Sequence, residues 1–287
     1  MDFIKYETKE EFLENNLEIL LKDEAKNEIM IGILLEHEND SIQNWLIGRI
    51  EEKGEVKAIF LVEDERKGLL LYSIDENISE NVANFLVDNL LNFNVDLKEI
   101  LTSKDNSKLI GKIYAEKSRK EMYIEQNMYI MTFNKIDEQS LLAENEKIEK
   151  LEKETVNYDC LKENIIEMYR DNFRGKECSE KEIQKVSEAF LRKGIYVLRN
   201  ELDEIVSQAV TVRKQINCCA IGGVITLERH RGHGYAKRLV HTLSNKLLKD
   251  GYKEVVLHVN SQNEPAISIY SKIGFEKIDE TIKVKFI

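Results

Sequence analysis

A glycine-rich stretch at residues 221–236 contains the residue types that most clearly suggest chemistry. Apolar residues lead into a turn with Gly232 and Gly234, and a helical pattern begins directly after it. Such a turn directs consecutive backbone N–H groups to one point, where the positive end of the helix dipole adds to them. The glycines let a ligand approach without a Cβ in the way, and Arg231 adds a permanent positive charge. The stretch therefore predicts an anion site that suits a diphosphate.

A second pattern, at residues 261–275, predicts a short helix. Asn263 is a suitable N-cap, and Pro265 falls in the first turn, where its missing N–H costs nothing. Gly274 is placed to end the helix. Tyr270 lies on the apolar face, so periodicity alone assigns it to the core.

Together the two patterns resemble the GNAT superfamily of acyl-CoA-dependent N-acyltransferases. The spacing Arg231-x-x-Gly234-x-Ala236 is similar to the turn that holds the pyrophosphate of coenzyme A in that superfamily. The arrangement from Asn263 through Tyr270 to Phe275 is similar to its closing signature. The resemblance covers roughly residues 145–287 and implies an α/β (α+β) GNAT fold, with a mixed, mostly antiparallel sheet and flanking helices.

The resemblance implies that acetyl-CoA is the acyl donor and that no metal takes part. The cofactor-binding residues would be Val224, Ile225, Thr226, Arg231, Gly232, His233, Gly234, Tyr235, Ala236 and Asn263. The backbone of residues 224–226 would pair with the pantetheine arm, and Gly222 and Gly223 would permit a bulge that opens the sheet.

Tyr270 would be the catalytic residue that protonates the departing thiolate. A thiol's pKa of about 8.5 lies below a phenol's of about 10, so this proton transfer assists departure without being demanding. The acceptor would be an amine of a small molecule or peptide that attacks the thioester directly in a ternary complex. No general base is assigned, because residues 217–226 contain no carboxylate and Glu228 and His258 both have ordinary structural explanations.

Several alternatives stay open at this stage. The glycines could serve a tight turn for steric reasons only, Asn263 could be a cap and nothing more, and Tyr270 could simply pack. His230 and His233 are expected to face solvent, although a phosphate contact is open. The chain could also be an acyl-CoA-binding sensor or regulatory module with little catalysis, or mainly an assembly scaffold.

The chain is expected to form two domains, 1–140 and 145–287, the first being a degenerate copy of the second or an unrelated α/β domain. In the second, strands are predicted at 146–153, 195–199, 205–213, 218–227 and 254–260, helices at 158–173, 180–193, 236–250 and 263–274, and a final strand pair at 275–287. In the first, helices are predicted at 8–36, 78–93 and 106–117 and strands at 57–63, 68–73, 97–102 and 121–134. After the strand 68–73 the chain continues Ile-Asp-Glu-Asn, which would repel a diphosphate, so this half is expected not to bind coenzyme A.

Composition narrows the function classes. The 287 residues carry a formal net charge of −11, which argues against a nucleic acid as the main partner. No apolar run has the length of a membrane span, and the N-terminus does not resemble a signal peptide. The four cysteines lack metal-site or redox spacing, so reduced, buried thiols and a cytoplasmic location are expected. Whether the chain forms a homodimer is left open.

Overall fold

The computed structural model describes residues 1–36, 44–63, 68–152, 159–172 and 178–287. It divides into two compact units, neither of which is one continuous stretch of chain. The first comprises residues 1–130, 259–262 and 277–287, and the second comprises residues 131–258 and 263–276. The expected boundary between residues 140 and 145 stays a prediction.

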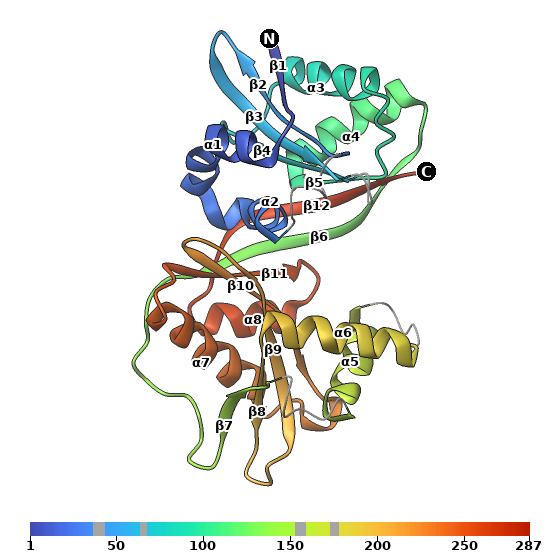
Figure 1. Ribbon diagram of the computed structural model, residues 1–287. Coiled ribbons are helices and arrows are strands. Elements are labelled where there is room, and N and C mark those ends of the chain that lie inside the picture. Colours follow the sequence, from blue (N-terminus) through green and yellow to red (C-terminus); the bar gives the residue numbers. More distant parts are fainter. Residues whose placement is uncertain (37–43, 64–67, 153–158, 173–177) are drawn as a thin grey trace. The chain divides into compact units, whose positions relative to one another are not determined.

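The first unit is a mixed sheet with helices on both faces (Figure 1). Its elements are β1 (Asp2–Tyr6), α1 (Lys9–Leu20), η1 (Leu21–Asp23), α2 (Glu24–Glu36), β2 (Leu46–Glu52), β3 (Glu55–Val62), β4 (Gly68–Ser73), α3 (Glu80–Asn92), β5 (Glu99–Ser103), α4 (Lys104–Ser118), the first part of β6 (Met122–Phe133), and most of β12 (Glu276–Phe286). The strand order is β1-β2-β3-β4-β5-β12, and all these pairs are antiparallel except β4 with β5.

Alternation along β3 explains the two helix layers of this unit. Phe60 and Val62 face the cluster that contains the buried side chains of α3 and α4. Ile59 and Leu61 face the opposite cluster, which contains Phe12 of α1 and the apolar side chains of α2. Because successive side chains of a strand point to opposite faces, one apolar run supplies both cores.

The last strand corrects the expectation of a strand pair at residues 275–287. The segment is a single strand, β12, and it pairs antiparallel with β5 from Thr281 opposite Ser103 to Lys285 opposite Glu99. Its residues Ile282, Val284 and Phe286 belong to the core of the first unit. The segment has no glycine, proline or asparagine that would favour a tight turn, so it continues as one strand.

The second unit repeats the plan of the first (Figure 1). Its elements are β7 (Lys147–Lys150), α5 (Asp159–Asn172), α6 (Glu180–Lys193), β8 (Ile195–Arg199), β9 (Ile205–Lys214), β10 (Cys218–Thr226), η3 (Glu228–His230), α7 (Tyr235–Lys249), most of β11 (Glu254–Asn260) and α8 (Glu264–Lys272). The strand order is β11-β10-β9-β8-β7, with only β10 and β11 parallel. Side chains of α5 and α6 pack with β8 and β9 in one core.

Both halves follow the order strand, two helices, three strands, helix, strand, helix. This order confirms the tandem arrangement predicted from the sequence. The predicted capping box of α6 is also present: the Ser179 hydroxyl accepts from the N–H of Glu182, whose carboxylate accepts from the N–H of Ser179. The single helix expected at 8–36 is instead two helices joined by the 3-10 turn η1, and β1 and β2 were not predicted.

Two further expectations concern thiols and membranes. Cys218 and Cys219 are buried, as predicted, and Cys178 is only partly buried; none of the three forms a disulfide with a described residue. The side chain of Cys160 lies outside the described residues. No helix in the described ranges is both long enough and apolar enough to cross a membrane.

Candidate functional site

Strand β10 separates from β11 within the second unit. The two strands pair from Cys218 opposite Glu254 to Ile221 opposite Leu257, yet β10 continues to Thr226. On its other edge, β10 shifts register against β9 between Gly222 and Ile225, so that residues 223 and 224 have no partner there. Gly223 has a φ of 56°, a value that favours glycine. A bulge at this place bends β10 and leaves backbone groups for another extended chain.

The three backbone residues predicted to pair with a ligand differ in their surroundings. The carbonyl of Ile225 accepts a hydrogen bond from the Ser207 hydroxyl at 2.8 Å, and the carbonyl of Thr226 accepts one from Nε of Arg231 at 3.1 Å. Val224 lies in the bulge, outside the register with β9. Val224 is therefore the residue whose backbone is best placed to receive a new partner.

Gln208 lies under this bulge and was not predicted from the sequence. Its side chain is fully buried, and its Nε2 is 3.5 Å from the carbonyl oxygen of Gly223. Its Oε1 is buried and has no hydrogen-bond partner among the described residues. A buried amide with an unused acceptor is costly unless something else satisfies it. No motif in the sequence signals this residue, because a glutamine within a strand is unremarkable by itself.

The predicted turn joins β10 to α7 and has the backbone form expected of an anion site. Gly232 and Gly234 have φ values of 83° and 75°, so both positions favour glycine. Helix α7 begins at Tyr235, with Gly234 as its N-cap, and no side chain caps it. Its first turn contains no acidic residue. The N–H groups at the start of α7 are consequently not used by a side-chain cap, and they form the positive end of the helix dipole.

Arg231 is held beside the turn by two acceptors. Its Nε donates to the carbonyl of Thr226, and its Nη2 donates to Oε1 of Glu167 at 2.6 Å. The Glu167 side chain is 8% exposed, and its other oxygen accepts from Arg170 at 3.0 Å. Arg231 therefore joins the end of β10 to α5, and part of its charge is already compensated. The sequence motif did not predict the Glu167 partner, which lies 64 residues away.

A stack of three side chains supports the other end of the turn. The His233 ring packs on Tyr235 with centroids 5.8 Å apart, and the Arg238 guanidinium lies 4.8 Å from the Tyr235 ring. Arg238 also donates to the carbonyl of His233 at 2.8 Å and forms a bidentate pair with Glu146. His233 is exposed, as expected, and its Nδ1 lies 3.0 Å from the carbonyl oxygen of Arg231.

Helix α8 places the two remaining predicted residues. Oδ1 of Asn263 accepts from the N–H of Ala266 at 3.2 Å, so Asn263 is the N-cap. Tyr270 is 8% exposed, and its ring packs against Phe275 with centroids 5.9 Å apart. Burial raises the pKa of Tyr270 to about 12, which keeps the phenol protonated at neutral pH. Its hydroxyl makes no hydrogen bond to any described residue.

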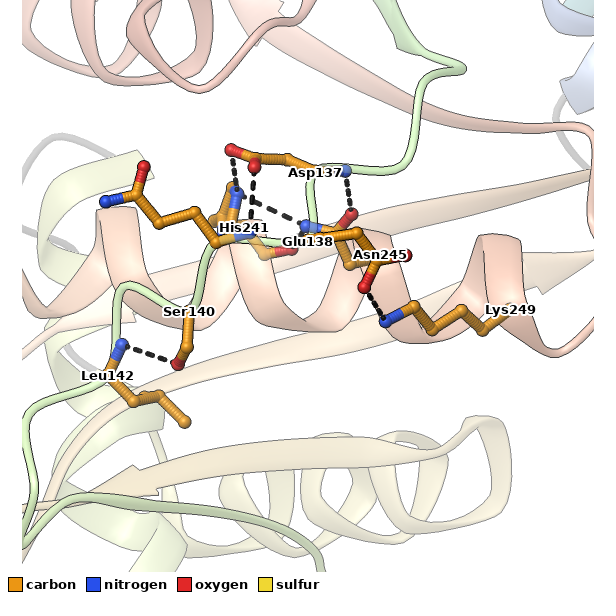
Figure 2. Close-up of polar contacts among 8 residues, drawn as sticks. Asp137, Glu138, Ser140, Leu142, His241, Asn245 and Lys249 are labelled. Atoms are coloured by element: carbon orange, nitrogen blue, oxygen red, sulfur yellow. Dashed lines mark hydrogen bonds and ion pairs between the residues drawn. The ribbon is translucent and has the colours of Figure 1, made fainter.

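A polar cluster joins α7 to the segment that follows β6 (Figure 2). The N–H of Asp137 donates to Oδ1 of Asn245 at 2.7 Å, and Oδ2 of Asp137 lies 3.1 Å from Nε2 of His241. Lys249 adds an ion pair with Glu138 at 3.2 Å. The N–H of Gln139, and next the His241 ring, lower the pKa of Asp137. The cluster attaches the segment after β6 to the helix whose start forms the predicted anion site.

The structure assigns no carboxylate to the position of a general base on β10. Glu228 lies in η3 with its side chain 75% exposed, near Arg170. His258 lies on β11 and is partly buried. The general base stays unassigned, as it was from the sequence.

Comparison with known proteins agrees with this geometry. A family model described as FR47-like protein matches residues 197–284, which include β10, the turn, α7 and α8. The chain is also 32% identical over 60 residues to the Bacillus subtilis (strain 168) protein named "Uncharacterized N-acetyltransferase YobR". That match covers 21% of this chain and 24% of the relative, so it spans about a quarter of that protein.

Solved structures share the fold over much longer stretches. An acetyltransferase of the GNAT family from Colwellia psychrerythraea has a TM-score of 0.54 at 12% identity, with 100% of this chain and 99% of that chain covered. A Drosophila protein reaches 0.61 at 11% identity over the same shares. A GCN5-related N-acetyltransferase from Sphaerobacter thermophilus has a TM-score of 0.55 at 14% identity over 84% and 80% of the two chains. At these identities the likeness concerns the fold.

Proposed function

We propose that this chain is a member of the GNAT superfamily that transfers an acetyl group from acetyl-CoA to an amine of a small molecule or peptide. The observation that carries the proposal is the continuity of three features along residues 222–235. The bulge of β10, the two positive-φ glycines and the uncapped start of α7 follow one another along the chain, with the end of β10 and the short turn η3 between the bulge and Gly232.

Each feature suits a different part of coenzyme A. The separated edge of β10 at Val224 offers backbone groups to the amides of the pantetheine arm. Gly232 and Gly234 leave space for the pyrophosphate, and the first N–H groups of α7 would donate to it. His233, Tyr235 and Ala236 belong to the same turn, and Arg231 stabilises it through its hydrogen bond to the carbonyl of Thr226.

The chemical step is then direct aminolysis of a thioester. The acceptor nitrogen attacks the carbonyl carbon as a free amine and forms the C–N bond of a tetrahedral intermediate. As the C–S bond breaks, the Tyr270 hydroxyl gives its proton to the leaving sulfur, and the proton that the acceptor nitrogen loses returns through water to the Tyr270 phenolate. A phenol whose pKa is raised to about 12 stays protonated over the physiological range, but it is also a weaker acid, so the breaking of the C–S bond must drive its proton transfer to the sulfur. A backbone N–H in the bulge would face the thioester oxygen, and one such donor contributes about 3 kcal/mol to transition-state stabilisation.

Calorimetric titration with acetyl-CoA, coenzyme A and desulfo-coenzyme A tests the first part of the proposal. We expect one site per chain and micromolar dissociation constants for all three, because the pyrophosphate and pantetheine are common to them. Absence of binding would refute the proposal. A panel of primary amines, followed by release of free thiol, then tests transfer. Binding without turnover on any amine would favour the acyl-CoA sensor instead.

A further inference from the structure

The first unit contains a cavity of about 650 Å³ at the end of its own separated strands. Strands β4 and β5 pair only from Gly68 opposite Glu99 to Leu70 opposite Leu101, although β4 continues to Ser73. The cavity lies where the pairing has ended, and its wall is completed by β12 and the junction of α1 and α2. Its volume is typical of a site for a small organic molecule.

The wall of this cavity carries six carboxylates and two lysines. The acidic residues are Asp23, Asp75, Glu76, Asp105, Asp279 and Glu280, and the basic residues are Lys26 and Lys104. This balance disfavours an anion and attracts a cation. The cavity therefore selects for a ligand of opposite charge to the diphosphate that the second unit is proposed to bind.

The carboxylates of the cavity wall differ in whether they form ion pairs within the protein. Glu280 is bonded to Lys104 at 2.8 Å and to Lys277 at 3.1 Å, and these contacts, Lys104 first, lower its pKa to about 2. Asp75, Glu76 and Asp105, by contrast, form no ion pair with any residue in the described ranges. These three carboxylates therefore have no close cationic partner within these ranges, although the charge of Lys57 acts on Asp75 and that of Lys104 on Asp105 from a longer distance.

A pair of unused hydroxyl groups provides independent evidence for a polar ligand. Ser103 of β5 and Thr281 of β12 lie directly opposite each other, and both line the cavity. Thr281 is 8% exposed, and neither its Oγ1 nor Oγ of Ser103 has a hydrogen-bond partner among the described residues. Buried hydroxyls are rarely left without a partner, because their desolvation then costs free energy that no bond recovers.

The arrangement favours an extended organic cation over a metal ion. Within the described ranges, no group of three or more His, Cys, Asp or Glu side chains is close enough to hold a metal. The carboxylates instead come from separate segments: the α1–α2 junction, the loop after β4, the start of α4, and β12. A chain molecule with several ammonium groups can reach separated carboxylates, whereas a single ion cannot.

We propose that this cavity is a binding site for a small organic di- or polyamine, which its carboxylates and the Ser103–Thr281 hydroxyl pair would hold. Spermidine is a suitable probe, since it carries three amines on a flexible chain. The inference does not depend on the coenzyme A site of the second unit, because it rests only on residues of the first.

Calorimetry of the full chain with spermidine and putrescine, in about 150 mM salt to screen loose charge attraction, tests this proposal. We expect one spermidine site per chain, and no binding of citrate. The triple variant Asp75→Asn, Glu76→Gln, Asp105→Asn should weaken spermidine binding at least tenfold. A control with the same change in charge, Glu14→Gln, Glu18→Gln, Glu116→Gln, alters exposed acids of the same unit away from the cavity and should keep the affinity.

Thr281→Val provides a second variant that does not threaten the fold. It removes an unpaired buried hydroxyl with little change in shape, so thermal stability should be kept or rise, while spermidine affinity should fall several-fold. Three results would overturn the proposal: no spermidine binding, equal loss in the two triple variants, or unchanged affinity in Thr281→Val. Coenzyme A titrations of the same variants keep the two sites distinguishable, since the affinity for coenzyme A should not change in any of them.

Discussion

The two halves of the chain share one plan but treat the place where their parallel strands separate in opposite ways. In the first half, the Thr102 hydroxyl crosses from β5 and donates to the carbonyl of Leu71 at 2.6 Å. Asn106, 1% exposed, donates to the Ser73 hydroxyl and accepts from the N–H of Ile78. In the first half, side chains therefore form hydrogen bonds with the groups at the point where the strands separate. In the second half, residues 223 and 224 at the corresponding point of β10 lie outside the register with β9.

The helices that follow the two separated strands differ in the same sense. Helix α3 has a capped start, with the Ser79 hydroxyl accepting from the N–H of Val82, and Glu80 lies in its first turn. Helix α7 starts at Gly234 with neither a side-chain cap nor an acid. A capped, acidic helix start is satisfied by its own residues, whereas an uncapped one leaves its first N–H groups open to water or to an anion. The shared fold alone therefore does not make the site; backbone groups that the protein leaves unsatisfied do.

Giving α7 an acid like that of α3 should produce the largest effect. Ala236→Asp places a carboxylate in the first turn of α7, where it favours the helix but repels a diphosphate. We expect coenzyme A affinity to fall at least about 100-fold, which corresponds to about 2.7 kcal/mol, with the melting temperature kept or slightly raised. Calorimetry and thermal unfolding measure the two quantities.

Ala236→Asn is the matched control, since it adds nearly the same volume without the charge. It should lose less than about tenfold in affinity, or 1.4 kcal/mol. If the Asp and Asn variants bind coenzyme A equally well, the start of α7 does not contact the pyrophosphate, and the contrast between the halves has no functional meaning.

Each half also contains a buried tyrosine on its last helix, and replacing the two tyrosines by phenylalanine should have different effects on stability and on kcat. The Tyr114 hydroxyl of α4 donates to the carbonyl of Val95 and accepts from the N–H of Leu97, whereas the Tyr270 hydroxyl has no partner among the described residues. Tyr114→Phe should therefore cost about 1 kcal/mol of unfolding free energy and leave kcat unchanged.

Tyr270→Phe should do the reverse if the phenol protonates the leaving sulfur. We expect kcat to fall between about 10- and 100-fold, with unchanged affinity for acetyl-CoA and nearly unchanged stability. Steady-state kinetics on the best amine acceptor and urea unfolding supply the measurements. If the Tyr270→Phe protein keeps its full kcat, Tyr270 has only the packing role that its periodicity predicts.

The raised pKa of Tyr270 predicts a smaller, pH-dependent effect on stability. Burial raises the pKa of this phenol to about 12, against about 10 when unfolded, so the folded state keeps its proton longer. The contribution of Tyr270 to the free energy of unfolding is therefore constant below pH 10 and falls as the pH rises from 10 towards 12. At pH 11 the loss is about 1.4 kcal/mol. Unfolding of wild type and Tyr270→Phe at pH 8 and pH 11 isolates it: the variant should lose less. An equal loss in both proteins would show that this phenol is solvated.

Local signals made much of the second half predictable. Ser179 and Glu182 fix the start of α6, Asn263 fixes the start of α8, and the glycines at 232 and 234 fix the turn. These residues act on neighbours within a few positions, and such interactions are visible in a sequence.

The sequence could not show what depends on distant partners. Glu167 meets Arg231 across 64 positions, and Glu146 meets Arg238 across 92. The pairing of β12 with β5 joins residues nearly 180 positions apart, so its apolar pattern predicted a strand but not its neighbour. The cavity of the first unit was also missed, because its wall combines four separated segments. Contacts of this kind depend on the whole fold, so a local sequence pattern does not predict them.

The smallest expected effect separates backbone strain from ligand contact. Gly234 and Gly54 have similar φ values, 75° and 81°. An added Cβ would meet nothing within 4 Å at Gly54, in the β2–β3 hairpin, and at Gly234 it would meet Nη1 of the flexible Arg238 side chain at 3.1 Å. Changing either residue to alanine should cost about 1 kcal/mol of stability, because both alanines would have to adopt a left-handed conformation. Only Gly234→Ala should also weaken coenzyme A binding, by a few-fold, since its Cβ would lie in the turn that is proposed to receive the pyrophosphate. If both variants lose the same stability and neither loses affinity, glycine at 234 serves the turn alone, and the anion site must be sought further along α7.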